Sequence, residues 1–219
     1  GLGDVYKRQD QKDAVRMALK NRVSCITGGP GRGKTTILKE VIKLWKRKDR
    51  EAEVILLAPT GKAAKRMTES TGIEAYTISR FVRDKGIKIG TKTIVFADEM
   101  SMTDIFLLLL LLNKVKNCQF IFVGDKDQLP SVGVGKCLED IINSNCIPVT
   151  YLTTCYRNDG SILNNITLIN AGCRLQELAV DTHFKTLWIN ERDKVFNSVI
   201  DTYMNNYEPV SYTHLRAHE

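Results

Sequence analysis

The sequence predicts an α/β fold, with a mostly parallel sheet flanked by helices. One indication is a glycine-rich loop at 28–35, which stands between a strand-like run and a segment of helical periodicity. Another is a series of short apolar runs at 54–58, 93–97 and 119–123, each of which ends in polar residues. In open parallel sheets, ligands bind at the carboxyl ends of the strands. The residues that follow these runs are therefore the first candidates for a functional site.

The glycine-rich loop fits G-x-x-x-x-G-K-[ST], the phosphate-binding pattern of nucleoside triphosphatases. It reads Gly28-Gly29-Pro30-Gly31-Arg32-Gly33-Lys34-Thr35. Glycines let backbone N–H groups turn toward phosphate oxygens, and the helix that follows points its positive end at them. We expect Lys34 to reach the β- and γ-phosphates and the Thr35 hydroxyl to hold Mg²⁺. The alternative, a structural glycine turn, must also explain the buried strand expected at 23–27 and the helical spacing after the loop.

The composition is that of an ordinary globular protein: 219 residues, 43% hydrophobic and 26% charged, enough for one large or two small domains. The net charge of +7 suits a polyanionic partner such as nucleic acid, although many basic proteins bind none. The six cysteines include no C-x-x-C pair, so we expect reduced thiols in a cytoplasmic protein without a zinc site. The longest apolar run, 105–112, is shorter than the ~20 residues of a membrane span and predicts a buried helix.

Both ends of the chain lack an interpretable pattern. Residues 1–9 and 211–219 resemble translated sequencing-adapter read-through, so we take about 10–210 as native and expect the protein to continue past both ends. His214 and His218 have i,i+4 metal-ligand spacing, but they fall in the suspect tail and no third ligand is evident. His183 is expected to be an ordinary polar residue.

Two further strand ends carry candidate groups. The run at 54–58 leads into Pro59-Thr60-Gly61-Lys62 and a basic helix, where Thr60 and Lys62 could hold a nucleic-acid phosphate. A helix N-cap with surface lysines explains the same residues about equally well. The run at 93–97 ends in Asp98 and Glu99, which are costly to place there without a nearby cation.

In a phosphate-loop ATPase, the first carboxylate of such a pair serves the Mg²⁺ shell, and the second orients or deprotonates the attacking water. A helix N-terminus, where acids are favoured, is the alternative. The phosphate loop upstream favours the catalytic interpretation of Asp98 and Glu99. The loop after the run at 119–123 offers two further candidates. Gln128 could sense a γ-phosphate, and Ser131 with its neighbouring glycines could contact nucleic acid. Taken alone, the residue types of this loop indicate only a turn.

The remaining elements are predicted from periodicity and turn signals. Helices are expected at 10–20, 75–82, 105–115, 138–142, 161–171 and 193–204, and strands at 148–152 and 184–189. Gln11 reads from sequence alone as an exposed helix glutamine. Arg157 could serve as an arginine finger on a γ-phosphate, whereas pairing with a surface acid is the commoner fate of an arginine.

The order of these motifs resembles the motor core of RecD-like helicases, in the 5′→3′ branch of superfamily 1. The matching segments are GGPGRGKTT at 28–36, APTGKAAKRM at 58–67, AYTISRF at 75–81, DEMSM at 98–102, GDKDQLPSVGVG at 124–135 and YRN at 156–158. Gln11 stands at the position of that family's adenine-contacting glutamine. The resemblance covers most of residues 10–172.

The resemblance implies a RecA-like P-loop NTPase domain at 10–152 and the incomplete start of a second RecA-like domain at 153–210. It implies ATP and Mg²⁺ as cofactors, single-stranded DNA as partner, and possible recombination or repair subunits. The ATP-binding set would be Gln11, Gly28, Gly29, Pro30, Gly31, Arg32, Gly33, Lys34, Thr35 and Thr36. The Mg²⁺ ligands would be Thr35 and Asp98, and the catalytic set Lys34, Glu99 as general base, Gln128 and Arg157. The DNA track would hold Pro59, Thr60, Lys62, Thr77 and Ser131.

Several positions depart from the family pattern. Arg32 replaces the usual threonine, and we expect its side chain to point to solvent. Ser79 stands where a histidine is common, and Asn158 replaces a frequent glutamine. The later motifs of the second domain are absent, so the ATP site is half present. The leading interpretation is an ATP-dependent helicase motor; the alternatives are a nucleotide-binding module that signals to a partner and the helicase part of a conjugative relaxase.

Overall fold

The computed structural model describes residues 9–49, 51–154, 161–174, 180, 189 and 191–206. The chain divides into two compact units, Gly1–Asn158 and Asp159–Glu219. The predicted domain limits at 9/10, 152/153 and 210/211 stay predictions.

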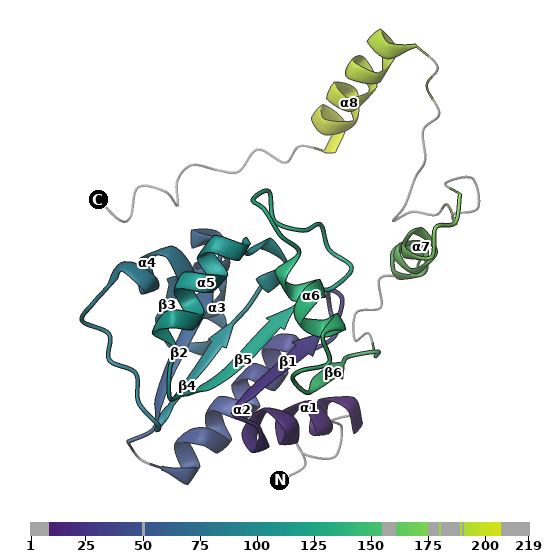
Figure 1. Ribbon diagram of the computed structural model, residues 1–219. Helices are drawn as coiled ribbons and strands as arrows, with labels where there is room; N and C mark the ends of the chain where they lie inside the picture. Colours follow the sequence, from purple (N-terminus) through teal and green to yellow (C-terminus); the bar gives the residue numbers. More distant parts are fainter. Residues whose placement is uncertain are drawn as a thin grey trace. The chain divides into compact units, whose positions relative to one another are not determined.

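The first unit is built on a six-stranded sheet in which every neighbouring pair is parallel, in the order β3-β2-β4-β5-β1-β6 (Figure 1). The strands are β1 (Val23–Thr27), β2 (Glu53–Ala58), β3 (Ala75–Thr77), β4 (Thr93–Ala97), β5 (Gln119–Gly124) and β6 (Val149–Tyr151). This sheet confirms the predicted α/β fold class. The strands that precede the candidate residues, β2, β4, β5 and β1, are consecutive neighbours, so their carboxyl ends lie along one edge.

Helices cover both faces of the sheet, which explains why the strands read as continuous apolar runs. The helices of this unit are α1 (Gln9–Lys20), α2 (Lys34–Lys48), α3 (Gly61–Thr71), α4 (Ile78–Arg83), α5 (Ile105–Lys114) and α6 (Cys137–Asn143). One hydrophobic cluster joins α1, α2 and α3 to the sheet, and a second joins α4, α5 and α6. Strand β5 shows the alternation: Phe120 and Phe122 belong to the second cluster, Ile121 and Val123 to the first.

The helix predicted over 75–82 is wrong in its first part. Ala75–Thr77 form strand β3, which pairs in parallel with Leu56–Ala58 at the edge of the sheet. The helix α4 begins only at Ile78, and the Thr77 hydroxyl caps it by accepting a hydrogen bond from the Arg80 N–H at 3.2 Å. Tertiary pairing with β2 therefore overrides the local helical pattern.

The prediction of a buried helix over 105–112 is also corrected. Within α5, Leu108 and Leu111 are buried against the sheet. The exposed side chains of this run are Ile105, Phe106, Leu109, Leu110 and Leu112, with between 43% and 68% of their surface accessible. A helix on one face of a sheet buries one side only, and an unbroken apolar run gives no periodicity to show which side that is. Within the residues that the structure describes, no helix is both long enough and apolar enough to cross a membrane.

The described part of the second unit contains α7 (Ser161–Asn170) and α8 (Arg192–Asn206), in agreement with the helices predicted at 161–171 and 193–204. The strand predicted at 184–189 falls almost wholly outside the described residues, as do Arg157 and the three histidines.

Candidate nucleotide-binding site

The phosphate-binding loop connects β1 to α2, so that Lys34, Thr35 and Thr36 form the first turn of the helix. Gly31 and Gly33 have φ angles of 71° and 84°, a left-handed conformation that disfavours any residue with a side chain. At Gly28 a side chain is excluded by steric overlap, because a Cβ there would lie 2.8 Å from the Leu152 Cβ. The loop thus packs directly against the end of β6, and the helix N-terminus offers N–H groups to an anion.

The Lys34 ammonium folds back over this loop. Its Nζ donates hydrogen bonds to the carbonyl oxygens of Gly28 and, at 3.2 Å, of Gly29. Desolvation lowers the pKa of Lys34, while the carboxylates of Asp125, Asp98 and Glu99 oppose that change. The cation therefore sits among three acidic side chains that come from the ends of two neighbouring strands, β4 and β5.

Asp98 and Glu99 follow β4 directly. The Asp98 N–H donates to the Leu57 carbonyl at 2.9 Å, and Asp98 Oδ1 accepts from the Glu99 N–H at 2.8 Å. Burial raises the pKa of Asp98, partly offset by that hydrogen bond and by the Lys34 charge. Glu99 has a φ of 53°, a left-handed conformation that costs energy for a residue with a side chain and that clusters at functional sites.

Thr35, Asp98 and Glu99 line one cavity of about 270 Å³ between α2, α3 and the end of β4. The cavity brings Thr35, Asp98 and Glu99 together, and Lys34 interacts electrostatically with both carboxylates. Among the described residues, no three His, Cys, Asp or Glu side chains gather into a metal-binding group. One hydroxyl and one carboxylate match the preference of Mg²⁺ for a few protein oxygens with the rest of its shell left to water and phosphate.

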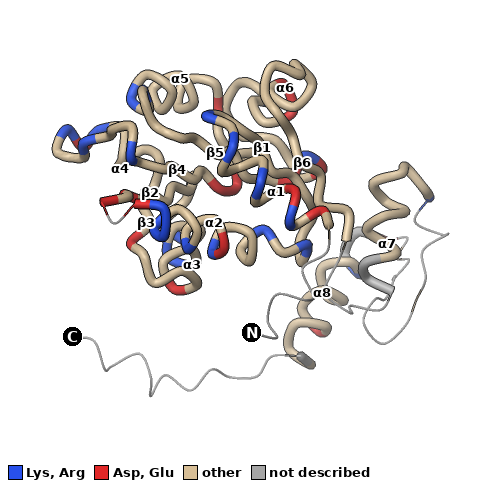
Figure 2. The backbone as a smooth tube through the Cα atoms, turned by 90° about the horizontal axis from the view of Figure 1, so that it is seen from below, with Lys and Arg blue, Asp and Glu red and all other residues tan. Residues whose placement is uncertain are grey.

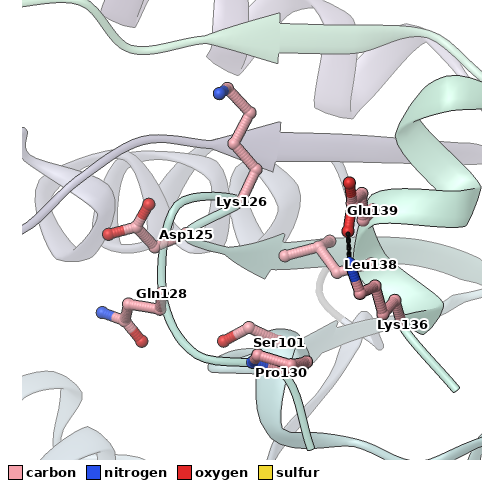
Figure 3. A pocket seen from close by; sticks show the side chains of 8 residues that line it. All are labelled: Ser101, Asp125, Lys126, Gln128, Pro130, Lys136, Leu138 and Glu139. Atoms are coloured by element: carbon pink, nitrogen blue, oxygen red, sulfur yellow. Dashed lines mark ion pairs between the residues drawn. The ribbon is translucent and has the colours of Figure 1, made fainter. Parts of the chain in front are cut away.

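Gln128 lies in the loop after β5 and lines a separate cavity of about 210 Å³, together with Ser101 and Asp125 (Figure 3). Its N–H donates to the Asp125 carbonyl at 3.3 Å. Asp125 is only 5% exposed, and its carboxylate accepts from the Asp127 N–H at 3.0 Å. Asp125 is a functional candidate that the sequence reasoning missed, although its place directly after a buried strand is the signal that identified Asp98.

The expectation that Arg32 points to solvent is wrong. Its Nη1 donates to the Leu152 carbonyl at 2.8 Å, and its side chain lies against Gly28 and Gly29. Its charge also adds to the lowering of the Lys34 pKa. Arg32 therefore ties the phosphate loop to the end of β6, a contact across 120 residues that the local pattern does not reveal.

Gln11 is not the exposed helix residue expected from sequence alone, because only 5% of its surface is accessible. The start of α1 lies close to the chain just after β6, where the Thr154 N–H donates to Asp10 Oδ2 at 3.4 Å. Gln11 and Arg32 are thus both on elements that contact the segment following β6. The adenine-contacting role of Gln11 stays a prediction.

The DNA candidates occupy the carboxyl ends of β2 and β3, where Ala58 and Thr77 are paired in register. The Thr60 hydroxyl accepts from the Ala63 N–H at 3.2 Å and caps α3, and Lys62 is exposed. Pro59 links β2 to that cap. Ser131 lies apart from them in the loop after β5, where its hydroxyl donates to the carbonyl oxygens of Gly133 and Gly135.

Sequence comparison places the chain among known proteins. Residues 7–192 match the family described as an AAA domain (AAA_30). The ATP-dependent RecD2 DNA helicase of Deinococcus radiodurans is 35% identical over 157 residues, covering 68% of this chain and 21% of that protein. The RecBCD enzyme subunit RecD of Mycolicibacterium smegmatis is 31% identical over 206 residues, covering 78% of this chain and 37% of that protein. The chain thus spans well under half the length of either relative.

Among solved structures, the Pif1 helicase of Candida albicans matches 93% of this chain and 56% of its own, with a TM-score of 0.57 and 17% identity. At that identity the likeness concerns the fold alone. Taken together, the family match and the RecD relatives show that this chain belongs to the AAA_30 family of AAA domains and is related to RecD-type helicases.

Proposed function

We propose that this chain is the motor core of a RecD-type helicase, which hydrolyses ATP to move 5′→3′ along single-stranded DNA. The observation that carries the proposal is the convergence of Lys34, Thr35, Asp98 and Glu99 on one site behind the phosphate loop. The relative from Deinococcus radiodurans is named a DNA helicase, which supports DNA rather than another polymer as the track.

Each residue of the site has a role that suits its environment. The Lys34 ammonium would exchange the Gly28 and Gly29 carbonyls for the β- and γ-phosphates, because anionic oxygens are stronger acceptors than amide oxygens. Thr35 and Asp98 would hold Mg²⁺, which supplies positive charge to the phosphates when bound. Glu99 would take the proton of the attacking water, and Gln128 would sense the γ-phosphate.

The remaining roles rest on the RecD resemblance. Gln11 and the loop residues Gly28 to Thr36 would bind ATP, and Arg157, outside the described residues, would approach the γ-phosphate from a second RecA-like domain beginning near residue 153. Pro59, Thr60, Lys62, Thr77 and Ser131 would lie along the DNA, where phosphate contacts give grip without sequence preference. We further propose that the protein works in the cytoplasm with recombination or repair subunits.

ATP hydrolysis by the full-length protein, measured without nucleic acid and with single-stranded DNA or RNA, tests the proposal. We expect stimulation by single-stranded DNA, and we expect Lys34→Ala to abolish turnover because the γ-phosphate loses its cation. Lys39→Ala is the control, since Lys39 is exposed on the same helix one turn beyond the loop. Stimulation by RNA alone, or by no nucleic acid, would count against a DNA helicase motor.

A further inference from the structure

Ser101 carries a buried hydroxyl without a hydrogen-bond partner. It lies in the 3₁₀ turn Met100–Met102, directly after the acidic pair, and only 8% of its surface is accessible. Within the described part of the chain, its Oγ is one of two buried side-chain atoms with no partner, the other being Ser24 Oγ. Native proteins rarely leave such a group unpaired, because no hydrogen bond within the protein then compensates for the hydrogen bonds to water that the hydroxyl loses on folding.

The turn that carries Ser101 is in close contact with the strand that leads to Gln128. A Cβ on Gly124, the last residue of β5, would lie 3.3 Å from the Met100 nitrogen and 3.5 Å from the Ser101 nitrogen. Beyond this contact, Ser101 and Gln128 line the same cavity, and the Ser101 hydroxyl is directed toward the side on which Gln128 lies (Figure 3). Ser101 is thus attached to the acidic pair and faces the proposed γ-phosphate sensor.

The chemistry of a glutamine side chain indicates what this hydroxyl could do. A γ-phosphate presents only acceptor oxygens, so Gln128 must offer it the Nε2 amide, which leaves Oε1 facing away and in need of a donor. Among the side chains that line the cavity, Lys126 and Lys136 already pair with Asp127 at 2.5 Å and Glu139 at 3.3 Å. Ser101 is the lining donor whose proton is uncommitted.

We propose that Ser101 is a positioning residue for Gln128. When ATP is bound, the Ser101 hydroxyl donates to Gln128 Oε1 and so orients Nε2 toward the γ-phosphate. This bond would give the unpaired Ser101 hydroxyl an acceptor. This inference rests on the proposed ATPase function and adds a link between the acidic pair and the loop that continues to Ser131.

The test compares Ser101→Ala with Ser24→Ala in the full-length protein. Both changes remove a buried, unpaired hydroxyl, but Ser24 lies on β1 and does not line the cavity. We expect Ser101→Ala to lower the DNA-stimulated kcat about ten-fold or more, with KM for ATP and the melting temperature held near the wild-type values. Ser24→Ala should leave all three unchanged.

A double-mutant cycle decides whether the effect passes through Gln128. In a Gln128→Ala background, Ser101→Ala should cause no further loss of kcat. Three results would overturn the role of Ser101 while leaving the proposed function in place. One is an equal loss of kcat in both backgrounds, and another is a lower melting temperature of Ser101→Ala. The third is full activity of Ser101→Ala when the wild type is active. A wild-type protein without DNA-stimulated ATPase would overturn the proposed function first.

Discussion

Asp98 and Glu99 are adjacent in the chain but lie in unlike environments. Asp98 is desolvated, so that its charged form is disfavoured, whereas Glu99 is held in a left-handed backbone conformation by the turn that follows. Two neighbouring carboxylates with different surroundings suit two different tasks, one as a metal ligand and one as a base. The desolvation of Asp98 and the backbone strain at Glu99 both lower the stability of the protein, and both arise from the arrangement of the site.

Asp98→Asn tests that cost through its pH dependence. Burial raises the pKa of Asp98 in the folded state, so protonated Asp98 stabilises the fold at low pH and this contribution is lost as pH rises through the raised value. Asparagine resembles the protonated form at every pH. We therefore expect the variant to melt higher than wild type near pH 8 without Mg²⁺, and the difference to shrink toward about pH 4.

Differential scanning fluorimetry in a chelating buffer measures this difference, with Asp13→Asn on the exposed side of α1 as the control. The same Asp98→Asn protein should lack Mg²⁺-dependent ATP hydrolysis. A melting temperature of the variant that falls below wild type equally at all pH values would contradict the expected rise.

At the scale of elements, the four central strands and the edge strand β6 were predictable from sequence, and the edge strand β3 was not. Strands β2, β4 and β5 are buried on both faces and read as apolar runs of four or more residues. Strand β1 is also buried, although Ser24 interrupts its apolar residues. Strand β3 has three residues, none fully buried, and exists because β2 offers it a ladder of hydrogen bonds. A segment so short carries no periodicity by which it could be recognised.

In the site, too, some residues could be predicted from local sequence patterns, whereas others depend on tertiary packing. Lys34, Thr35, Asp98 and Glu99 could be grouped from sequence because parallel strands deliver their carboxyl ends to one edge. The contact of Arg32 with Leu152 and the burial of Gln11 depend on how β6 and α1 pack beside the loop, which no local pattern encodes. Asp125 was missed for another reason: the loop after β5 offers several polar residues, and sequence alone does not tell which of them is buried.

Helix α5 allows a stability test of its one-sided burial. The Leu111 side chain is fully buried. We expect Leu111→Ala to lower the free energy of unfolding by about 2–5 kcal/mol, because the substitution leaves a cavity against the sheet. Leu109→Ala, at 58% exposure on the opposite side, should change it by less than about 0.5 kcal/mol. Urea titration followed by circular dichroism measures both, and equal losses would mean that a partner covers the outer face of α5.

At the scale of the molecule, the net charge of +7 belongs to the whole chain, and its distribution can be followed over the described residues of the first unit (Figure 2). Figure 2 shows Lys and Arg segments interspersed with Asp and Glu segments over the first unit. Helix α2 ends in the basic residues Lys46, Arg47 and Lys48, yet each helix that follows a strand returns to the amino-terminal edge of the sheet. These charges are therefore remote from the carboxyl edge, where the nucleotide and DNA candidates lie.

This geometry predicts which lysines contribute to DNA binding. Lys62 stands at the start of α3 on the carboxyl edge, and Lys46 is equally exposed at the far end of α2. Each cation that neutralises a phosphate of single-stranded DNA adds about 0.7 to the slope of log affinity against log salt. In the full-length protein, Lys62→Ala should weaken binding to all sequences alike and reduce that slope by about 0.7, whereas Lys46→Ala should change neither. Fluorescence anisotropy with labelled oligonucleotides over a range of salt concentrations measures both quantities. If the two variants lose slope equally, diffuse charge rather than the carboxyl edge of the sheet holds the DNA.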